Sequence, residues 1–229
     1  ISDQTTRQLI QNINPQQLPL KQHDPMAIKK TQHPKGLTFQ RYYTTTNTPV
    51  FDMFEYDYRS SVIRNPNGEV VFEMKNVEVP SHWSQIATDI LAQKYFRKAG
   101  VPQADGSLGR ETSVKQVAHR MAHCWRIWGE RYGYFQSTDD AQVFYDELVY
   151  TILNQSCAPN SPQWFNTGLH ASYQISGKAQ GHYYVDPVSG QLCKSQNAYE
   201  RPQPHACFIL SVEDDLVNDG GIMDLWVRE

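Results

Sequence analysis

The side chains best suited to chemistry stand in two separate stretches of the sequence. Cys207 lies near the start of the apolar run ACFILSV, after two prolines, where the end of a strand can present one thiol to a cleft. Ser161 lies in the stretch APNSPQWFNTG, a predicted loop in which a hydroxyl and free backbone N–H groups can hold an anion. Isolated residues of these types are more often a small buried hydrophobe and a turn-stabilising hydroxyl, so both interpretations stay open.

Other residues are weaker candidates for chemistry. Cys124 lies on the apolar side of an expected helix, where packing is the simpler interpretation, and Cys157 and Cys193 fall in expected loops without an acid–base partner. Trp164 and Phe165 are expected to pack in the core. No two cysteines have C-x-x-C spacing, and four are too few for a disulfide scaffold. We therefore expect free thiols and a reducing cytoplasm.

A histidine pair at i and i+4, His119 and His123, has the spacing of two metal ligands on one helix face. The pair lacks the glutamate that follows the first histidine of a metallohydrolase helix, because Arg120 stands there. The sequence therefore favours a solvated helix face and predicts no metal site.

Composition narrows the class of protein. The 21 basic and 24 acidic residues leave a formal net charge of −3, so no strong positive field exists to attract a nucleic-acid backbone. No apolar run approaches the ~18 residues of a membrane span, and the first residues lack the charged-then-apolar pattern of a secretory signal. We expect a soluble, cytoplasmic protein that binds neither nucleic acid nor membrane.

The N-terminal two thirds of the chain divide into two regions. Residues 1–50 are rich in Gln, Pro and Thr and are expected to form an irregular arm. Residues 51–155 predict a β-hairpin about the turn Asn65–Gly68, because Asn-Gly supplies the positive φ that tight hairpins need. Apolar residues at helical spacing and Ser-led capping patterns then predict three helices, at 81–100, 113–130 and 137–154.

Residues 156–229 change character, because the prolines of APNSP cannot continue a helix. The region predicts short strands about the Pro187–Gly190 turn and a buried strand over 206–212. The acidic residues 213–215 are interpreted as favourable charge near the start of a helix, and GGIMDLWVRE as a helix-compatible pattern.

Eight separated blocks of the sequence carry a family resemblance. They are SSVIRNPNGEVVFE, VEVPSHWSQIATDILAQKYFRKAGVP, ETSVKQV, GYF, APNSPQWFNTGL, GHYYVD, PQPHACFI and GGIMDLWVRE. In this order they resemble the N-terminal part of the large chain of class II, adenosylcobalamin-dependent ribonucleotide reductases. The resemblance spans residues 36–229, and it is specific because eight blocks in order are hard to produce by chance.

The resemblance implies an α+β fragment in which a mainly helical N-terminal lobe with a β-hairpin leads into the first strands of a ten-stranded α/β barrel. Residues 156–229 would begin that barrel, and 206–212 would be among its earliest strands. The implied activity is conversion of ribonucleotides to deoxyribonucleotides by thiyl-radical chemistry. Adenosylcobalamin is the implied cofactor, with contacts expected mostly beyond Glu229, and the fragment alone is expected to be inactive.

The resemblance also implies roles for three residues. Cys207 matches the first cysteine of the reducing pair, beside the ribose 2′ position, and Ser161 matches the hydroxyl that helps hold the substrate's phosphates. The backbone of Ala206 and Cys207 matches a further substrate contact. The implied partners are a ribonucleotide, either a diphosphate or a triphosphate, the remaining C-terminal part of the same reductase, and a thiol reductant such as thioredoxin.

Two other functions stay open at this point. In the first, the chain is a stand-alone interaction module whose tryptophan-rich helix 113–130 docks onto a partner, and Cys207 is inert. In the second, Cys207 acts with His205 as a radical-independent thiol enzyme. This second alternative is weaker, because no third residue is evident that would orient the histidine.

Overall fold

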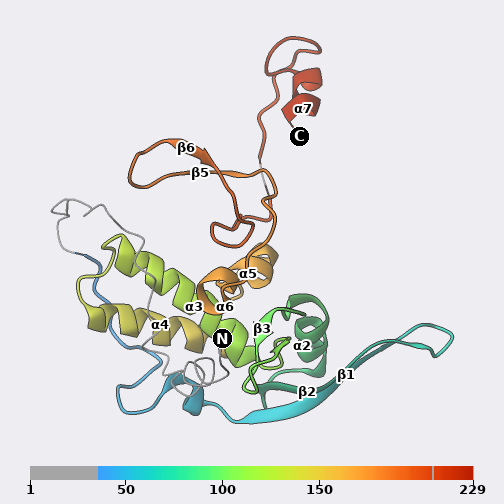
Figure 1. Ribbon diagram of the computed structural model, residues 1–229, viewed down its shortest axis with the longest axis vertical. Helices are drawn as coiled ribbons and strands as arrows, with labels where there is room; N and C mark the ends of the chain where they lie inside the picture. The colour runs from blue at the N-terminus through green and yellow to red at the C-terminus, as the bar shows by residue number, and fades with distance from the viewer. Residues whose placement is uncertain (1–35, 208, 229) are drawn as a thin grey trace, which may run out of the picture.

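The computed structural model describes residues 36–207 and 209–228 and has a mixed α+β architecture (Figure 1). Helices form the main body, a long β-hairpin projects from it, and the C-terminal residues extend away beyond a smaller hairpin (Figure 1). None of the described helices is both long and apolar enough to cross a bilayer. The helical elements are η1 (Val50–Met53), α2 (Gln85–Ile90), η2 (Leu91–Tyr95), α3 (Val114–Arg131), α4 (Thr138–Leu153), α5 (Ser161–Asn166), α6 (Leu169–Tyr173) and α7 (Ile222–Arg228). The strands are β1 (Tyr56–Arg64), β2 (Val70–Pro80), β3 (Val101–Pro102), β4 (Leu108–Gly109), β5 (Tyr183–Val185) and β6 (Leu192–Lys194).

The helices α3 and α4 form the centre of the body and begin at the predicted capping residues. Ser113 Oγ accepts a hydrogen bond from the backbone N–H of Lys115 at 3.1 Å, and the Gln116 side chain accepts one from the Ser113 N–H at 3.0 Å. Ser137 Oγ accepts the N–H of Asp140 at 3.1 Å. These caps pair donors that a helix start leaves free, and both predicted helices are confirmed.

The main core lies where α3 and α4 meet the base of the long hairpin. Val117 and Met121 of α3 are fully buried, as is Val149 of α4. Val77 and Val79 of β2 are also fully buried and belong to the same cluster. Burial of these apolar side chains fixes the two helices and the hairpin base to one another.

The predicted β-hairpin is confirmed as the antiparallel pair β1 and β2, which runs from Tyr56 opposite Pro80 to Arg64 opposite Val70. Gly68 in its turn has a φ of +87°, a left-handed conformation that glycine adopts without strain. A Cβ placed there would meet no atom within 4 Å. The turn is therefore open to solvent, and the hairpin tip reaches well beyond the helices (Figure 1).

The helix expected over 81–100 ends earlier in the structure. α2 begins after the capping residue Ser84 and passes into the π-helical turn η2, which ends at Tyr95. Phe96 then takes extended backbone, with φ −63° and ψ 132°, and is only 3% exposed. The predicted end at Gly100 was wrong because burying Phe96 in the core turns the chain out of the helix.

The N-terminal arm can be followed only in part, since residues 1–35 lie outside the described residues. Residues 36–49 form no helix or strand, as expected. They lie along α4, where the Glu147 carboxylate accepts the backbone N–H groups of Tyr42, Tyr43 and Thr44 and the Thr44 hydroxyl at 2.6–3.2 Å. One carboxylate therefore fastens this part of the arm to the helical body.

The stretch around Ser161 is helical, whereas the sequence predicts a loop. α5 begins at Ser161, with Pro162 in its first turn, where the missing N–H of proline has no helical partner to lose. α6 follows at once, after Gly168. The two short helices were missed because the prolines were interpreted only as helix breakers.

The C-terminal region confirms its short strands and its last helix but not the barrel strand. β5 and β6 flank the predicted turn, and α7 forms within GGIMDLWVRE. No described residue of 206–212 is in a strand, because no neighbouring strand pairs with its backbone there. The described strands form three separate two-stranded antiparallel sheets. The interpretation of residues 213–215 was also wrong, since α7 begins only at Ile222 and Asp215 instead accepts the N–H groups of Val217 and Asn218.

Candidate functional site

The Ser161 hydroxyl has the phenol of Tyr95 as its hydrogen-bond partner. The Ser161 hydroxyl oxygen lies 3.1 Å from the hydroxyl oxygen of Tyr95, the last residue of η2. Ser161 as a whole is partly buried, and its hydroxyl has a protein hydrogen-bond partner. The contact with Tyr95 therefore fixes where the Ser161 hydroxyl lies, as a ligand-binding hydroxyl requires.

Two aromatic residues of α5 pack on the Tyr95 ring. The ring centroids of Trp164 and Phe165 lie 5.4 Å and 5.2 Å from that of Tyr95. The Trp164 indole N–H donates to the Pro159 carbonyl at 2.7 Å. Trp164 therefore packs as expected, whereas Phe165 remains 42% exposed and is not a core residue.

A fully buried ion pair supports the C-terminal end of α5. Arg120 of α3 and Glu111 have side chains that are 0% exposed, with Arg120 Nε 2.7 Å from Glu111 Oε1. The guanidinium also donates to the carbonyls of Trp164, at 2.6 Å, and Thr167, at 2.7 Å. These carbonyls lie at the C-terminal end of α5, where a cation satisfies acceptors that have no helical partner. Arg120 therefore anchors α5 to α3.

The Glu111 carboxylate joins further segments to this anchor. It accepts the backbone N–H of Arg97 at 2.7 Å and the hydroxyl of Tyr173, on α6, at 2.9 Å. Burial, with the nearby Glu111 charge, raises the pKa of Tyr173 above its ordinary value, so this phenol keeps its proton and remains a donor. Because the backbone N–H of Arg97 donates to the Glu111 carboxylate, it is not available for a further helical hydrogen bond, and the preceding helix ends.

The turn between α5 and α6 is pressed against α3. Gly168 has a φ of +83°, and a Cβ placed on it would lie 2.0 Å from the Arg120 carbonyl oxygen. Only glycine fits such a close approach of two backbones. The turn and the Arg120 anchor therefore fix the position of α5 together.

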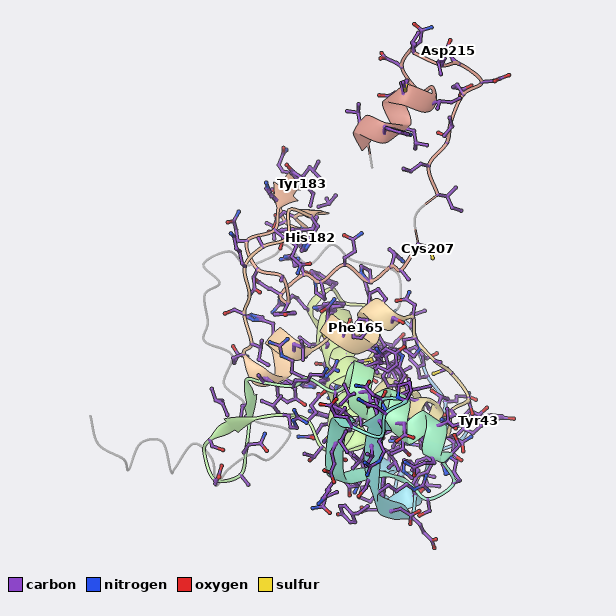
Figure 2. All side chains as sticks on the ribbon, turned by 90° about the vertical axis from the view of Figure 1, so that its right-hand side faces the viewer. Tyr43, Phe165, His182, Tyr183, Cys207 and Asp215 are labelled. Atoms are coloured by element: carbon purple, nitrogen blue, oxygen red, sulfur yellow. The ribbon has the colours of Figure 1, made fainter. Side chains whose placement is uncertain are left out.

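Cys207 lies in different surroundings. It is a free, exposed thiol on the extended stretch between β6 and α7, with His205 and Ala206 exposed beside it. Figure 2 shows Cys207 apart from Phe165, which belongs to the same helix as Ser161. The structure does not bring the thiol and the hydroxyl together, and their proximity stays a prediction.

The other cysteines are all free. Cys124 is buried in α3 as expected, and burial raises the pKa of its thiol to about 12. Cys157 is half-buried in a loop, with its Sγ 3.3 Å from Thr151 Oγ1. Cys193 was expected in a loop but lies in β6.

The histidine pair does not form a solvated helix face. His119 and His123 stack with ring centroids 5.0 Å apart, and His119 Nδ1 lies 2.8 Å from the Tyr145 hydroxyl of α4. Burial, with a smaller effect of His123, lowers the pKa of His119 to about 4. The prediction was wrong because α4 covers this face of α3. Within the part of the chain that the structure describes, no three His, Cys, Asp or Glu side chains gather as a metal site.

A small recess of about 100 Å³ lies beside α5. It is lined by Trp83, Ile152, Gln155, Cys157, Ala158 and Trp164. The recess is too small for a corrin ring, so its residues do not fit cobalamin. We assign no described residue to that cofactor.

Three residues that shape the site around Ser161 escaped sequence analysis, namely Tyr95, Glu111 and Arg120. Arg120 had a usable signal, since it falls three residues after Val117 on the apolar side of its helix. A charged side chain on such a face implies a buried partner. Tyr95 and Glu111 offered no comparable signal.

Comparison with known proteins gives consistent results. Residues 57–155 match the family model described as class II vitamin B12-dependent ribonucleotide reductase. Among the similar proteins are three bacterial ones that are each named vitamin B12-dependent ribonucleotide reductase. The Bradyrhizobium diazoefficiens protein is 51% identical, covering 84% of this chain and 18% of that protein. The Agrobacterium fabrum protein is 49% identical, covering 84% and 17%, and the Rhodopirellula baltica protein is 38% identical, covering 79% and 17%.

These similarities define the chain as ribonucleotide reductase sequence, which the eight blocks had indicated. More particularly, the chain belongs to the class II, vitamin B12-dependent family. It spans only 17% to 18% of the length of the three relatives.

Proposed function

We propose that this chain is the N-terminal portion of a reductase that converts ribonucleotides to deoxyribonucleotides when joined to the rest of the enzyme. The observation that carries the proposal is the 51% identity to a vitamin B12-dependent ribonucleotide reductase over 84% of the chain. Alone, the chain is expected to be inactive, because it spans 18% of that relative.

The exposed apolar side chains of the C-terminal region support a need for the rest of the enzyme. Ile209 is fully exposed, and Trp226 and Val227 of α7 are 77% and 84% exposed. A concentration of large apolar side chains at the surface is normally covered by a partner. We assign residues 156–229 to the beginning of a ten-stranded α/β barrel, in which 206–212 becomes a strand once neighbouring strands supply backbone partners.

Cys207 is assigned to the reducing pair of cysteines. In this reaction a thiyl radical first takes the ribose 3′ hydrogen, which is returned at the end. The 2′ carbon–oxygen bond breaks, the oxygen leaves as water, and a new carbon–hydrogen bond forms at the 2′ position. Two thiols supply the two electrons and close to a disulfide. A thiol reductant such as thioredoxin is the proposed partner that later reduces this disulfide.

Ser161 is assigned to the phosphate end of the substrate, and the backbone of Ala206 and Cys207 to a further contact. Ser161 is partly exposed as a residue and its hydroxyl is held beside Tyr95, which supports a role as donor to a phosphate oxygen. A hydroxyl and backbone amides accept a diphosphate or a triphosphate. Cobalamin dependence follows from the family, and the cytoplasm is the compartment that a deoxyribonucleotide-forming enzyme with free thiols implies.

The alternative function as an interaction module gains no support. α3, the tryptophan-rich helix, packs against α4, α5 and α6. Trp125 and Trp128 are both partly buried. The helix is thus already engaged inside the protein.

The assay that tests the proposal is deoxyribonucleotide formation by the complete reductase with adenosylcobalamin and a dithiol. Cys207→Ser should abolish turnover, because a hydroxyl cannot close a disulfide. Cys193→Ser is the matched control, since Cys193 is another free thiol within residues 156–229, and it should retain activity. Full activity of Cys207→Ser would contradict the assignment.

A further inference from the structure

The π-helical turn η2 sets the direction of Tyr95. The Phe96 N–H donates to the Leu91 carbonyl at 3.0 Å, an i to i+5 hydrogen bond, and the chain leaves the helix immediately afterwards. Such turns are rare and are found frequently at functional sites. Here the turn ends on the residue whose phenol meets α5.

The Tyr95 phenol is held in place by its neighbours. Its ring packs against Trp164 and Phe165, with centroids 5.4 Å and 5.2 Å away, and its hydroxyl lies 3.1 Å from Ser161 Oγ. All three contacts are with the same short helix, whose Trp164 carbonyl accepts a hydrogen bond from Arg120. These contacts place the phenol and the serine hydroxyl within hydrogen-bond distance of each other.

The chemistry of the two hydroxyls determines how they share protons. A serine hydroxyl has one hydrogen and can accept two hydrogen bonds, whereas a phosphate oxygen accepts only. If the phenol donates to Ser161 Oγ, the serine hydrogen is left for the phosphate. If Ser161 donates to the phenol, its hydrogen points away from the ligand. A bound phosphate therefore favours the first arrangement.

We propose that Tyr95 is a positioning residue for substrate binding, whose O–H donates to Ser161 Oγ and directs the Ser161 hydrogen to a phosphate oxygen of the ribonucleotide. The proposal rests on the assignment of Ser161 to the substrate's phosphates. Tyr95 does not touch the substrate and acts through Ser161 alone.

Tyr95→Phe in the complete reductase tests this role, because it removes the hydroxyl and keeps the ring that packs on α5. The KM for the ribonucleotide should rise about two- to ten-fold, the loss expected for one hydrogen bond. The kcat at saturating substrate should stay within about twofold, because an interaction equal in ground and transition states affects KM alone. Tyr145→Phe is the matched control, since it removes a phenol that contacts His119 away from α5, and it should leave KM unchanged.

A double-mutant cycle with Ser161→Ala decides whether Tyr95 acts through Ser161. If it does, Tyr95→Phe should add nothing to the KM increase caused by Ser161→Ala, and Ser161→Thr should keep KM near that of the unmodified enzyme. An increase in KM with Ser161→Ala but none with Tyr95→Phe, or increases that multiply in the double variant, would overturn only the Tyr95 role. An unchanged KM with Ser161→Ala would remove both the phosphate assignment and the role of Tyr95. Thermal unfolding of each variant confirms that it folds.

Discussion

Ser161 and Cys207 are assigned to one site, yet the two regions that carry them differ in nearly every physical respect. The region of Ser161 is tied to α3 by Arg120, a fully buried cation with two hydrogen bonds to Glu111, one to Trp164 of α5 and one to Thr167, which follows α5. The region of Cys207 is an extended stretch of exposed residues. The chain therefore fixes the position of Ser161 through its own contacts, whereas its described residues supply few contacts that would fix Cys207.

The largest expected effect on stability comes from removing the buried Arg120 guanidinium, which pairs with Glu111. Arg120→Met leaves Glu111 as an unpaired buried charge and should lower the free energy of unfolding by about 3–5 kcal/mol. Arg126→Met is the control, since Arg126 forms a partly exposed pair with Glu130 at 2.9 Å and should cost about 0–1 kcal/mol. Urea denaturation measures both values. Equal losses in the two variants would mean that the region of Ser161 is not held by the buried pair.

A second, smaller effect is expected at the α5–α6 turn. Gly168→Ala adds both strain at positive φ and a collision with the Arg120 carbonyl, and it should cost about 2–4 kcal/mol. Gly190→Ala separates the two causes, because Gly190 has a φ of +68° but no atom within 4 Å of a Cβ, and strain alone should cost about 1–2 kcal/mol. Denaturation curves of the two variants that coincide would rule out tight packing of the turn on α3.

The smallest effect is a pH dependence of stability that arises where α3 packs on α4 and not in the exposed stretch of Cys207. Burial holds the pKa of His119 at about 4, below the ordinary value of 6.5 that applies in the unfolded chain, so the unfolded chain takes up the proton first. Stability should therefore fall as the pH drops from 7 to 5, by at most about 1.4 kcal/mol per pH unit. His119→Gln should make this dependence shallower, and His205→Gln, in the exposed stretch, should leave it unchanged. A slope that His119→Gln does not alter would show that this histidine is not the titrating group.

Sequence patterns predicted the elements whose signals are local. The Ser113 and Ser137 caps predict α3 and α4, and Asn-Gly predicts the turn of the long hairpin, because each depends on residues a few positions apart. The apolar run 206–212 predicted a strand that none of its described residues forms, since a strand also needs a neighbouring strand that no local pattern reveals. The same limit applies to helix ends, because the turn at Phe96 is set by its burial against distant residues.

The candidate site was predictable only where a family resemblance supplied it. Their residue types and surroundings made Ser161 and Cys207 candidates, but only the order of the blocks assigned them roles. The contacts that fix Ser161 join residues far apart in the chain, such as Tyr95 to Ser161 and Arg120 to Trp164. Contacts of this kind follow from the folded packing, and one sequence contains no periodic signal for them.

The tip of the projecting hairpin of β1 and β2 is a suitable site for attaching a label. A Cβ at Gly68 in its turn would meet no atom within 4 Å, and the tip lies well away from α5 and from the C-terminal stretch (Figure 1). A fluorophore or affinity tag attached at this tip would report on assembly with the remaining reductase without touching either half of the candidate site.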